Sequence, residues 1–111
     1  MSVLVTGGLG YIGSHTCVEL MNAGQEIVVV DNLYNCKKSS YDRIKALTGK
    51  DFSFYECDIR NKEGLNEVFE KENITSVIHF AGLKAVGESV RKPLEYFDNN
   101  ITGTLVLLDV M

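Results

Sequence analysis

Four glycines and one aspartate have the types and the spacing of a site for phosphate and ribose. The glycines fall within seven residues and the aspartate follows 18 positions after the last of them: Gly7, Gly8, Gly10, Gly13 and Asp31. Residues without a Cβ let a phosphate approach backbone N–H groups closely. A carboxylate about 20 residues further on can accept hydrogen bonds from ribose hydroxyls. Together these residues predict a dinucleotide site.

The elements expected around these residues are those that such a site requires. Residues 3–6 predict a buried strand, residues 11–23 a helix, and residues 26–30 a second strand that ends in Asp31. The start of a helix has unpaired N–H groups and a partial positive charge, which suit a pyrophosphate. A plain tight turn is the alternative, but the position of the glycines between strand and helix favours binding.

Asp31 also predicts which dinucleotide binds. Its carboxylate would repel the 2′-phosphate of NADP, so NAD is the expected cofactor. Lys37 and Lys38 are near enough in the sequence to raise the question of NADP. We interpret them as solvated lysines at the entry to the next helix.

The rest of the chain continues to alternate strands and helices. Helices are expected at residues 39–48, between Asn61 and Asn73, and from Pro93 onward, and strands at residues 52–57 and 75–80. This order predicts an α/β fold, a Rossmann-like parallel sheet with strand order 3-2-1-4 and helices on both faces. The partly alternating pattern of residues 52–57 predicts a strand at the sheet edge.

We expect residues 1–111 to be the amino-terminal part of an NAD-binding domain, ending before a fifth strand and without a substrate domain. In such a sheet, ligands bind beyond the carboxyl ends of the strands. The segments expected there are residues 7–13, Asp31, Asp58 and residues 80–84. Their convergence predicts a single crevice for the cofactor.

The composition narrows the class of protein. The chain has 111 residues, 45% of them hydrophobic, and its net charge of −4 includes no long block of one sign. One soluble domain is expected, with no nucleic-acid partner. No membrane partner is expected either, because no apolar run reaches the ~20 residues of a membrane helix. Since the first residues also predict a strand rather than a signal peptide, the expected location is the cytoplasm. Cys17, Cys36 and Cys57 form no CxxC pair, which indicates reduced thiols and no metal site.

With these segments in place, the chain resembles the amino-terminal part of the extended short-chain dehydrogenase/reductase family, and within it the enzymes that epimerise nucleotide sugars. The resemblance covers essentially the whole chain. It rests on VTGGLGYIGSHT at residues 5–16, VDNL at 30–33, DIRN at 58–61, HFAGLKAVGESV at 79–90 and KPLEYFDNN at 92–100.

The resemblance implies how the cofactor is held. Backbone N–H groups at the start of the first helix would contact the pyrophosphate, residues 31–36 the adenosine, residues 58–59 the adenine, and residues 80–84 the nicotinamide side. The last helix would add one asparagine. The expected cofactor-binding residues are Gly7, Gly10, Tyr11, Ile12, Gly13, Asp31, Asn32, Leu33, Tyr34, Asn35, Cys36, Asp58, Ile59, Phe80, Ala81, Gly82, Leu83, Lys84 and Asn99.

The resemblance also implies a reaction, inversion at C4 of a UDP-hexose by transient hydride transfer to NAD. The family's base is the tyrosine of a YxxxK pair, which needs a nearby cation because an ordinary phenol has a pKa of about 10. Tyr41 and Lys45 match that spacing, but they fall in the helix at the adenosine end, and we interpret them as a solvated helix face. We therefore predict no catalytic residue within the chain, and no epimerase activity of the chain alone.

Two alternatives to an epimerase stay open. One is a nucleotide-sugar dehydratase of the same family, and the other is a non-catalytic NAD-sensing or interaction module. A YxxxK motif in a longer gene product would favour an enzyme.

Three single features complete the expectations. His79 is interpreted as a hydrogen-bonded structural residue. Lys84 either binds ligand oxygens or is an exposed loop lysine. In the family that the chain resembles, the last helix helps to form a dimer interface, so a homodimer through this helix is expected. The apolar residues along the helix are Tyr96, Phe97, Ile101, Leu105, Leu108 and Met111.

Overall fold

The computed structural model describes residues 2–32, 39–81 and 93–111. Its elements are β1 (Ser2–Thr6), α1 (Tyr11–Asn22), β2 (Glu26–Asp31), α2 (Ser39–Thr48), β3 (Ser53–Glu56), α3 (Lys62–Lys71), β4 (Ile74–His79), α5 (Pro93–Phe97), the π-helical turn η1 (Asp98–Thr102) and α6 (Gly103–Val110). The predicted strands and the first three predicted helices are confirmed, with ends that differ by one or two residues, and the last predicted helix is divided by η1.

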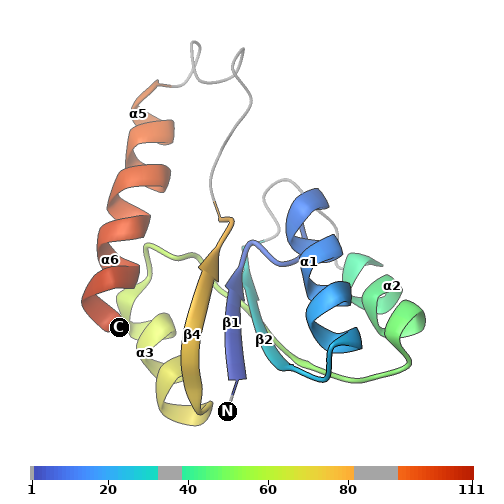
Figure 1. The fold of residues 1–111 in the computed structure, drawn as a ribbon. Coiled ribbons are helices and arrows are strands. Elements are labelled where there is room, and N and C mark those ends of the chain that lie inside the picture. Colours follow the sequence, from blue (N-terminus) through green and yellow to red (C-terminus); the bar gives the residue numbers. More distant parts are fainter. Residues whose placement is uncertain (1, 33–38, 82–92) are drawn as a thin grey trace.

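The strands form one parallel sheet in the predicted order β3-β2-β1-β4. Val5 of β1 lies opposite Val29 of β2 on one side and Ile78 of β4 on the other. Helices cover both faces: α1 and α2 lie on one, and α3 and α6 on the other (Figure 1). Parallel strands need such helical crossovers, and the helices form one layer on each face of the sheet.

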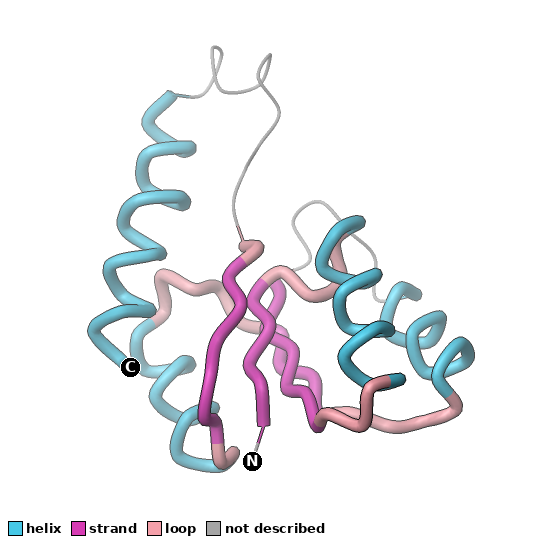
Figure 2. The backbone as a smooth tube through the Cα atoms, in the orientation of Figure 1, coloured by secondary structure: helices cyan, strands magenta, loops and turns pink. Residues whose placement is uncertain are grey.

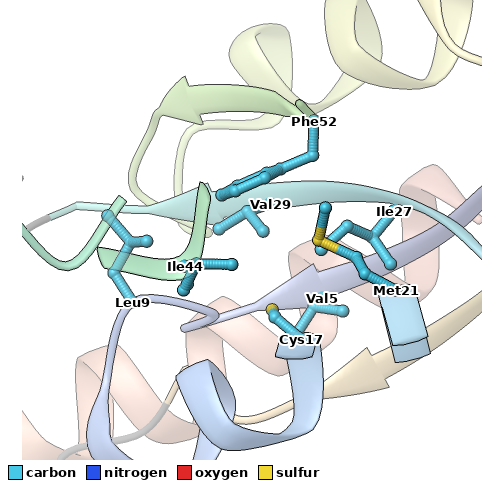
Figure 3. Close-up of a cluster of buried hydrophobic side chains, with 8 residues drawn as sticks. All are labelled: Val5, Leu9, Cys17, Met21, Ile27, Val29, Ile44 and Phe52. Carbon is cyan, nitrogen blue, oxygen red and sulfur yellow. The ribbon is translucent and has the colours of Figure 1, made fainter. Parts of the chain in front are cut away.

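Alternate residues of the central strands divide the core into two clusters. On the side of α1 and α2 the cluster consists of Val5, Leu9, Cys17, Met21, Ile27, Val29, Ile44 and Phe52 (Figure 3). On the other side it consists of Leu4, Val28, Val30, Ile59, Leu65, Val68 and Leu107. Because successive strand side chains point to opposite faces, the apolar run of β2 supplies both clusters.

The edge strand β4 is less buried than its apolar sequence indicates. Thr75, Ser76 and His79 are exposed, whereas Val77 packs partly against the second cluster. Within the described residues β4 has a hydrogen-bonded neighbour only in β1. His79, the last residue of β4, therefore lies on a partly exposed sheet edge.

The last helix differs from the regular helix that the sequence predicts. Its middle is the π-helical turn η1, and the side facing the sheet carries Asn99, Gly103 and Leu107. A Cβ on Gly103 would overlap the Ile59 side chain, so glycine allows this helix to approach the core. The apolar residues Ile101, Leu105, Leu108 and Met111 are 52–63% exposed instead.

Candidate functional site

The parallel strands bring their carboxyl ends to one side of the sheet, called the carboxyl edge below (Figures 1 and 2). The glycine turn follows β1 there, and Asp31 ends β2. Asp58 lies two residues beyond β3, and Phe80 follows β4 directly. The topology thus brings the four predicted segments to the same edge, as far as they fall within the described residues.

The glycine turn is pressed against its neighbours on both sides. Gly7 has a φ of +67°, and its N–H donates to the carbonyl of Val30 at 2.8 Å. A Cβ at position 7 would lie 2.8 Å from the backbone nitrogen of Ala81, and one on Gly13 would overlap the carbonyl oxygen of Gly7. Glycine is therefore required for the turn to pass between β2 and β4, and its backbone stays free of side chains.

The start of α1 fits a pyrophosphate. The N-cap residue before it, Gly10, has no side chain to cap the helix, and the first turn has no acidic residue. The first N–H groups of a helix have no partner within the helix and favour an anion. The side chains of Tyr11 and Ile12 are 83% and 56% exposed, so the backbone is what this segment offers to a phosphate.

Asp31 is held beside the glycine turn. Its side chain is buried, with 7% of the residue exposed, and Oδ2 accepts a hydrogen bond from the Leu9 N–H at 3.2 Å. The backbone carbonyl of Asp31 accepts a second hydrogen bond, from the Cys57 N–H at 3.1 Å. A fixed carboxylate at the end of the second strand is what the ribose of a dinucleotide requires.

Asp58 is held by several hydrogen bonds from Arg60. Arg60 contacts it through Nε at 2.9 Å and Nη2 at 2.6 Å, and Arg60 also donates its backbone N–H at 2.9 Å. Hydrogen bonds from the Arg60 side chain lower the pKa of Asp58, and one from the Asn32 side chain acts in the same direction. Asp58 is therefore a charged acceptor. The next residue, Ile59, is 4% exposed and packs in the core, so only its backbone is available to a ligand.

A hydrogen-bond chain that sequence reasoning missed fixes the end of β4. The Oγ1 atom of Thr6 accepts from the N–H groups of Phe80 at 3.1 Å and Ala81 at 3.3 Å, and lies 2.5 Å from Nδ1 of His79. The other ring nitrogen of His79 lies 3.1 Å from Oγ1 of Thr104. The structural interpretation of His79 agrees with these contacts. The sequence signal for Thr6 is a lone polar residue at the end of a buried strand.

The partners assign the proton positions in this chain. Thr104 donates its hydroxyl proton to the carbonyl of Asn100 at 2.7 Å, so its oxygen accepts from Nε2–H of His79. Nδ1 then has a lone pair, and the Thr6 hydroxyl donates to it. Thr6 thereby holds the backbone of residues 80–81, at the start of the segment expected beside the nicotinamide.

Asn99 lies in the π-helical turn and is 7% exposed. Its Nδ2 donates to Oδ1 of Asn100 at 3.0 Å. π-helical turns are frequent at functional sites. Seven expected site residues lie outside the described residues: Leu33, Tyr34, Asn35, Cys36, Gly82, Leu83 and Lys84.

Tyr41 and Lys45, which match the YxxxK spacing, lie on α2 and contact a different part of the chain. The Tyr41 hydroxyl donates to Asp51 at 3.2 Å and to the carbonyl of Phe52 at 3.3 Å. Burial and the hydrogen bond to Asp51 raise the pKa of Tyr41 above its ordinary value. A base for neutral pH needs the opposite shift, so these contacts support the expectation that the pair is not catalytic.

Neither a metal cluster nor a membrane-spanning helix occurs in the part of the chain that the structure describes. Cys17 and Cys57 are free thiols, and burial raises the pKa of Cys17 to about 12. A protonated thiol packed among apolar residues is inert.

Comparison with protein families matches residues 4–111 to the family described as GDP-mannose 4,6 dehydratase. Among curated proteins, the chain is 59% identical over 111 residues to the UDP-glucose 4-epimerase of Bacillus subtilis (strain 168). The match covers 100% of this chain and 33% of that protein. It is 59% identical to the UDP-glucose 4-epimerase of Klebsiella pneumoniae, of which it spans 80%. The chain thus spans about a third of the length of the first relatives that it matches.

Solved structures agree with this result. A UDP-glucose-4-epimerase from Stenotrophomonas maltophila, crystallised with NAD and formylated UDP-arabinopyranose, is 49% identical with a TM-score of 0.97. A UDP-glucose 4-epimerase from Bifidobacterium longum, in complex with NAD+ and UDP, is 51% identical with the same TM-score. In both, the match covers 100% of this chain and 33% of the other.

Proposed function

Because the chain belongs to the UDP-glucose 4-epimerase family, within the group that the GDP-mannose 4,6 dehydratase model describes, we propose that it is the NAD-binding part of a UDP-glucose 4-epimerase. The observation that carries this proposal is the bare glycine turn beside the buried carboxylate of Asp31. NAD, when bound, would take up a hydride from C4 of the sugar and return it to the other face. The UDP-hexose itself, UDP-glucose or UDP-galactose, would be bound by the longer protein.

Each described segment of the carboxyl edge has a role in this proposal. The N–H groups at the start of α1 hold the pyrophosphate over the glycine turn, and the Asp31 carboxylate accepts hydrogen bonds from the ribose hydroxyls. Asp58 and the backbone of Ile59 lie along the adenine, residues 80–81 begin the nicotinamide side, and Asn99 reaches the cofactor from η1. The rest of the expected site residues keep the roles that the sequence resemblance implies.

The proposal is tested by calorimetric titration of the purified chain with NAD and NADP. We expect NAD to bind and NADP to bind more weakly, because Asp31 repels the 2′-phosphate. Asp31→Ala should weaken NAD binding about tenfold through the lost hydrogen bonds, and Asp31→Asn should mainly reduce the preference for NAD. The 111 residues alone should not interconvert UDP-glucose and UDP-galactose.

Two controls make this test decisive. Asp31→Asn retains an oxygen for the Leu9 N–H, which separates the charge from the support of the turn. Asp51→Ala removes an exposed carboxylate at the opposite end of the sheet and should leave NAD binding unchanged. Absence of NAD binding by the unmodified chain and by the longer gene product would contradict the proposal. A non-catalytic NAD-sensing module would bind NAD but lack epimerase activity in the longer gene product as well.

The exposed apolar stripe of the last helix supports a homodimer. Ile101, Leu105 and Leu108 are spaced by four and three residues, lie on one side of the helix and are 52%, 61% and 60% exposed. Two copies of such a stripe can pack together as an isologous interface. We expect no nucleic-acid or membrane partner, and the cytoplasm remains the expected location.

The dimer is tested by light scattering coupled to size-exclusion chromatography. Leu105→Lys should convert a dimeric mass to a monomeric one, because it places two charges in the apolar contact. Leu47→Lys is the matched control, since Leu47 is 65% exposed but lies on α2. A monomeric mass of the unmodified protein at high concentration would contradict the dimer.

A further inference from the structure

The Arg60 side chain joins two segments of the carboxyl edge that are far apart in the sequence. Its Nε and Nη2 atoms contact the two carboxylate oxygens of Asp58 at 2.9 and 2.6 Å. Its Nη1 atom contacts Oδ2 of Asp98 at 2.5 Å. Asp98 is the first residue of η1 and directly precedes the buried Asn99. One guanidinium therefore connects the loop after β3 with the π-helical turn of the last helix.

The geometry of this contact fixes the orientation of the Arg60 and Asp58 side chains relative to each other. A guanidinium offers its N–H groups in a rigid plane, and two parallel hydrogen bonds to a carboxylate fix the plane of that carboxylate as well. The backbone N–H of Arg60 adds a third bond to Oδ1 of Asp58. Asp58 is thus oriented by three hydrogen bonds from Arg60.

Stability alone is a weak explanation for this cluster. The Arg60, Asp58 and Asp98 side chains are 35%, 29% and 52% exposed, and ion pairs of such exposure contribute little to folding. A second pair, Lys62 with Asp109 at 2.6 Å, also connects α3 with the last helix. That pair links the start of α3 to the last helix without contacting Asp58, so Arg60 is not the sole ion-pair link to this helix among the described residues.

We propose that Arg60 is a positioning residue for the adenine of the dinucleotide: it orients the Asp58 carboxylate as a hydrogen-bond acceptor and links it to the helical turn that carries Asn99. This inference rests on the proposed function, because it assumes that NAD binds at the carboxyl edge. A correctly oriented carboxylate accepts a hydrogen bond from the exocyclic amino group of adenine. Hypoxanthine has an oxygen at that position and cannot donate this bond.

The inference is tested with NAD and nicotinamide hypoxanthine dinucleotide, titrated into the full-length gene product by calorimetry. The unmodified protein should prefer NAD about tenfold, the value of a hydrogen bond to a charged acceptor. Arg60→Gln should reduce the preference to about twofold, since Asp58 keeps its charge but loses its orientation. Arg60→Lys should give an intermediate ratio because lysine lacks the planar fork.

Controls separate positioning from a structural effect. Lys62→Gln breaks the ion pair with Asp109, which does not involve Asp58, and should leave the ratio unchanged. Asp98→Asn weakens only the link to η1 and should reduce the ratio less than Arg60→Gln. An Arg60→Gln variant that binds both dinucleotides more weakly at an unchanged ratio would overturn the inference, as would an unmodified protein that binds NAD without preferring it. If the unmodified protein binds neither dinucleotide, the proposed function itself fails.

Discussion

Replacing Gly7 with alanine is expected to lower the free energy of unfolding by about 4 kcal/mol, in the upper range of single substitutions. Two costs add at this position. A residue with a Cβ at a φ of +67° costs roughly 1–2 kcal/mol. The new Cβ would also lie 2.8–2.9 Å from backbone atoms of Phe80 and Ala81, which cannot move without shifting the end of β4.

Gly49 provides the matched control for this substitution. Its φ is also +67°, but a Cβ there would meet nothing within 4 Å. Gly49→Ala should therefore cost only the backbone term, about 1 kcal/mol. Urea denaturation of both variants measures the difference. Equal losses would show that the contact with β4 does not constrain the turn, and Gly7→Ala would then also keep its affinity for NAD.

The main features of the fold could be predicted from the sequence because they depend on local patterns. The same holds for the part of the carboxyl edge that the glycine turn and Asp31 form. The apolar run of β2 ends in Asp31 and the glycines precede α1, so periodicity and spacing locate both. Asn61 was also predictable as a helix cap, and its side chain accepts from the Gly64 N–H at 3.1 Å. These interactions span few residues, and their chemistry is visible in the order of the chain.

The remaining features depend on contacts between distant residues. Arg60 bonds to a residue 38 positions away, and Thr6 to one 73 positions away, so neither role has a local signal. The buried face of the last helix was not predicted because two of its three buried residues, Asn99 and Gly103, have no apolar side chain. The buried positions are Asn99, Gly103 and Leu107 rather than the more regular apolar stripe.

The Thr6→Val substitution should lower the free energy of unfolding by about 2–3 kcal/mol, although valine has nearly the same shape. Thr6 is fully buried, and its hydroxyl is both the donor to His79 and an acceptor for the Ala81 N–H. Valine removes both bonds, and each lost bond to such a part-buried group costs about 1–1.5 kcal/mol. The Phe80 N–H retains its bond to the Thr6 carbonyl at 2.9 Å, which limits the loss.

Thr75→Val is the control, because Thr75 is exposed on β4 and its hydroxyl makes only a 3.4 Å contact with the Ser2 carbonyl. It should change stability by less than about 0.5 kcal/mol. A double-mutant cycle of Thr6→Val with Thr104→Val then tests whether the two hydroxyls are coupled through His79. If the hydroxyls act through His79, their effects are not additive, since either loss disorders the same ring. Additive effects would mean that the two threonines support the sheet and the last helix independently.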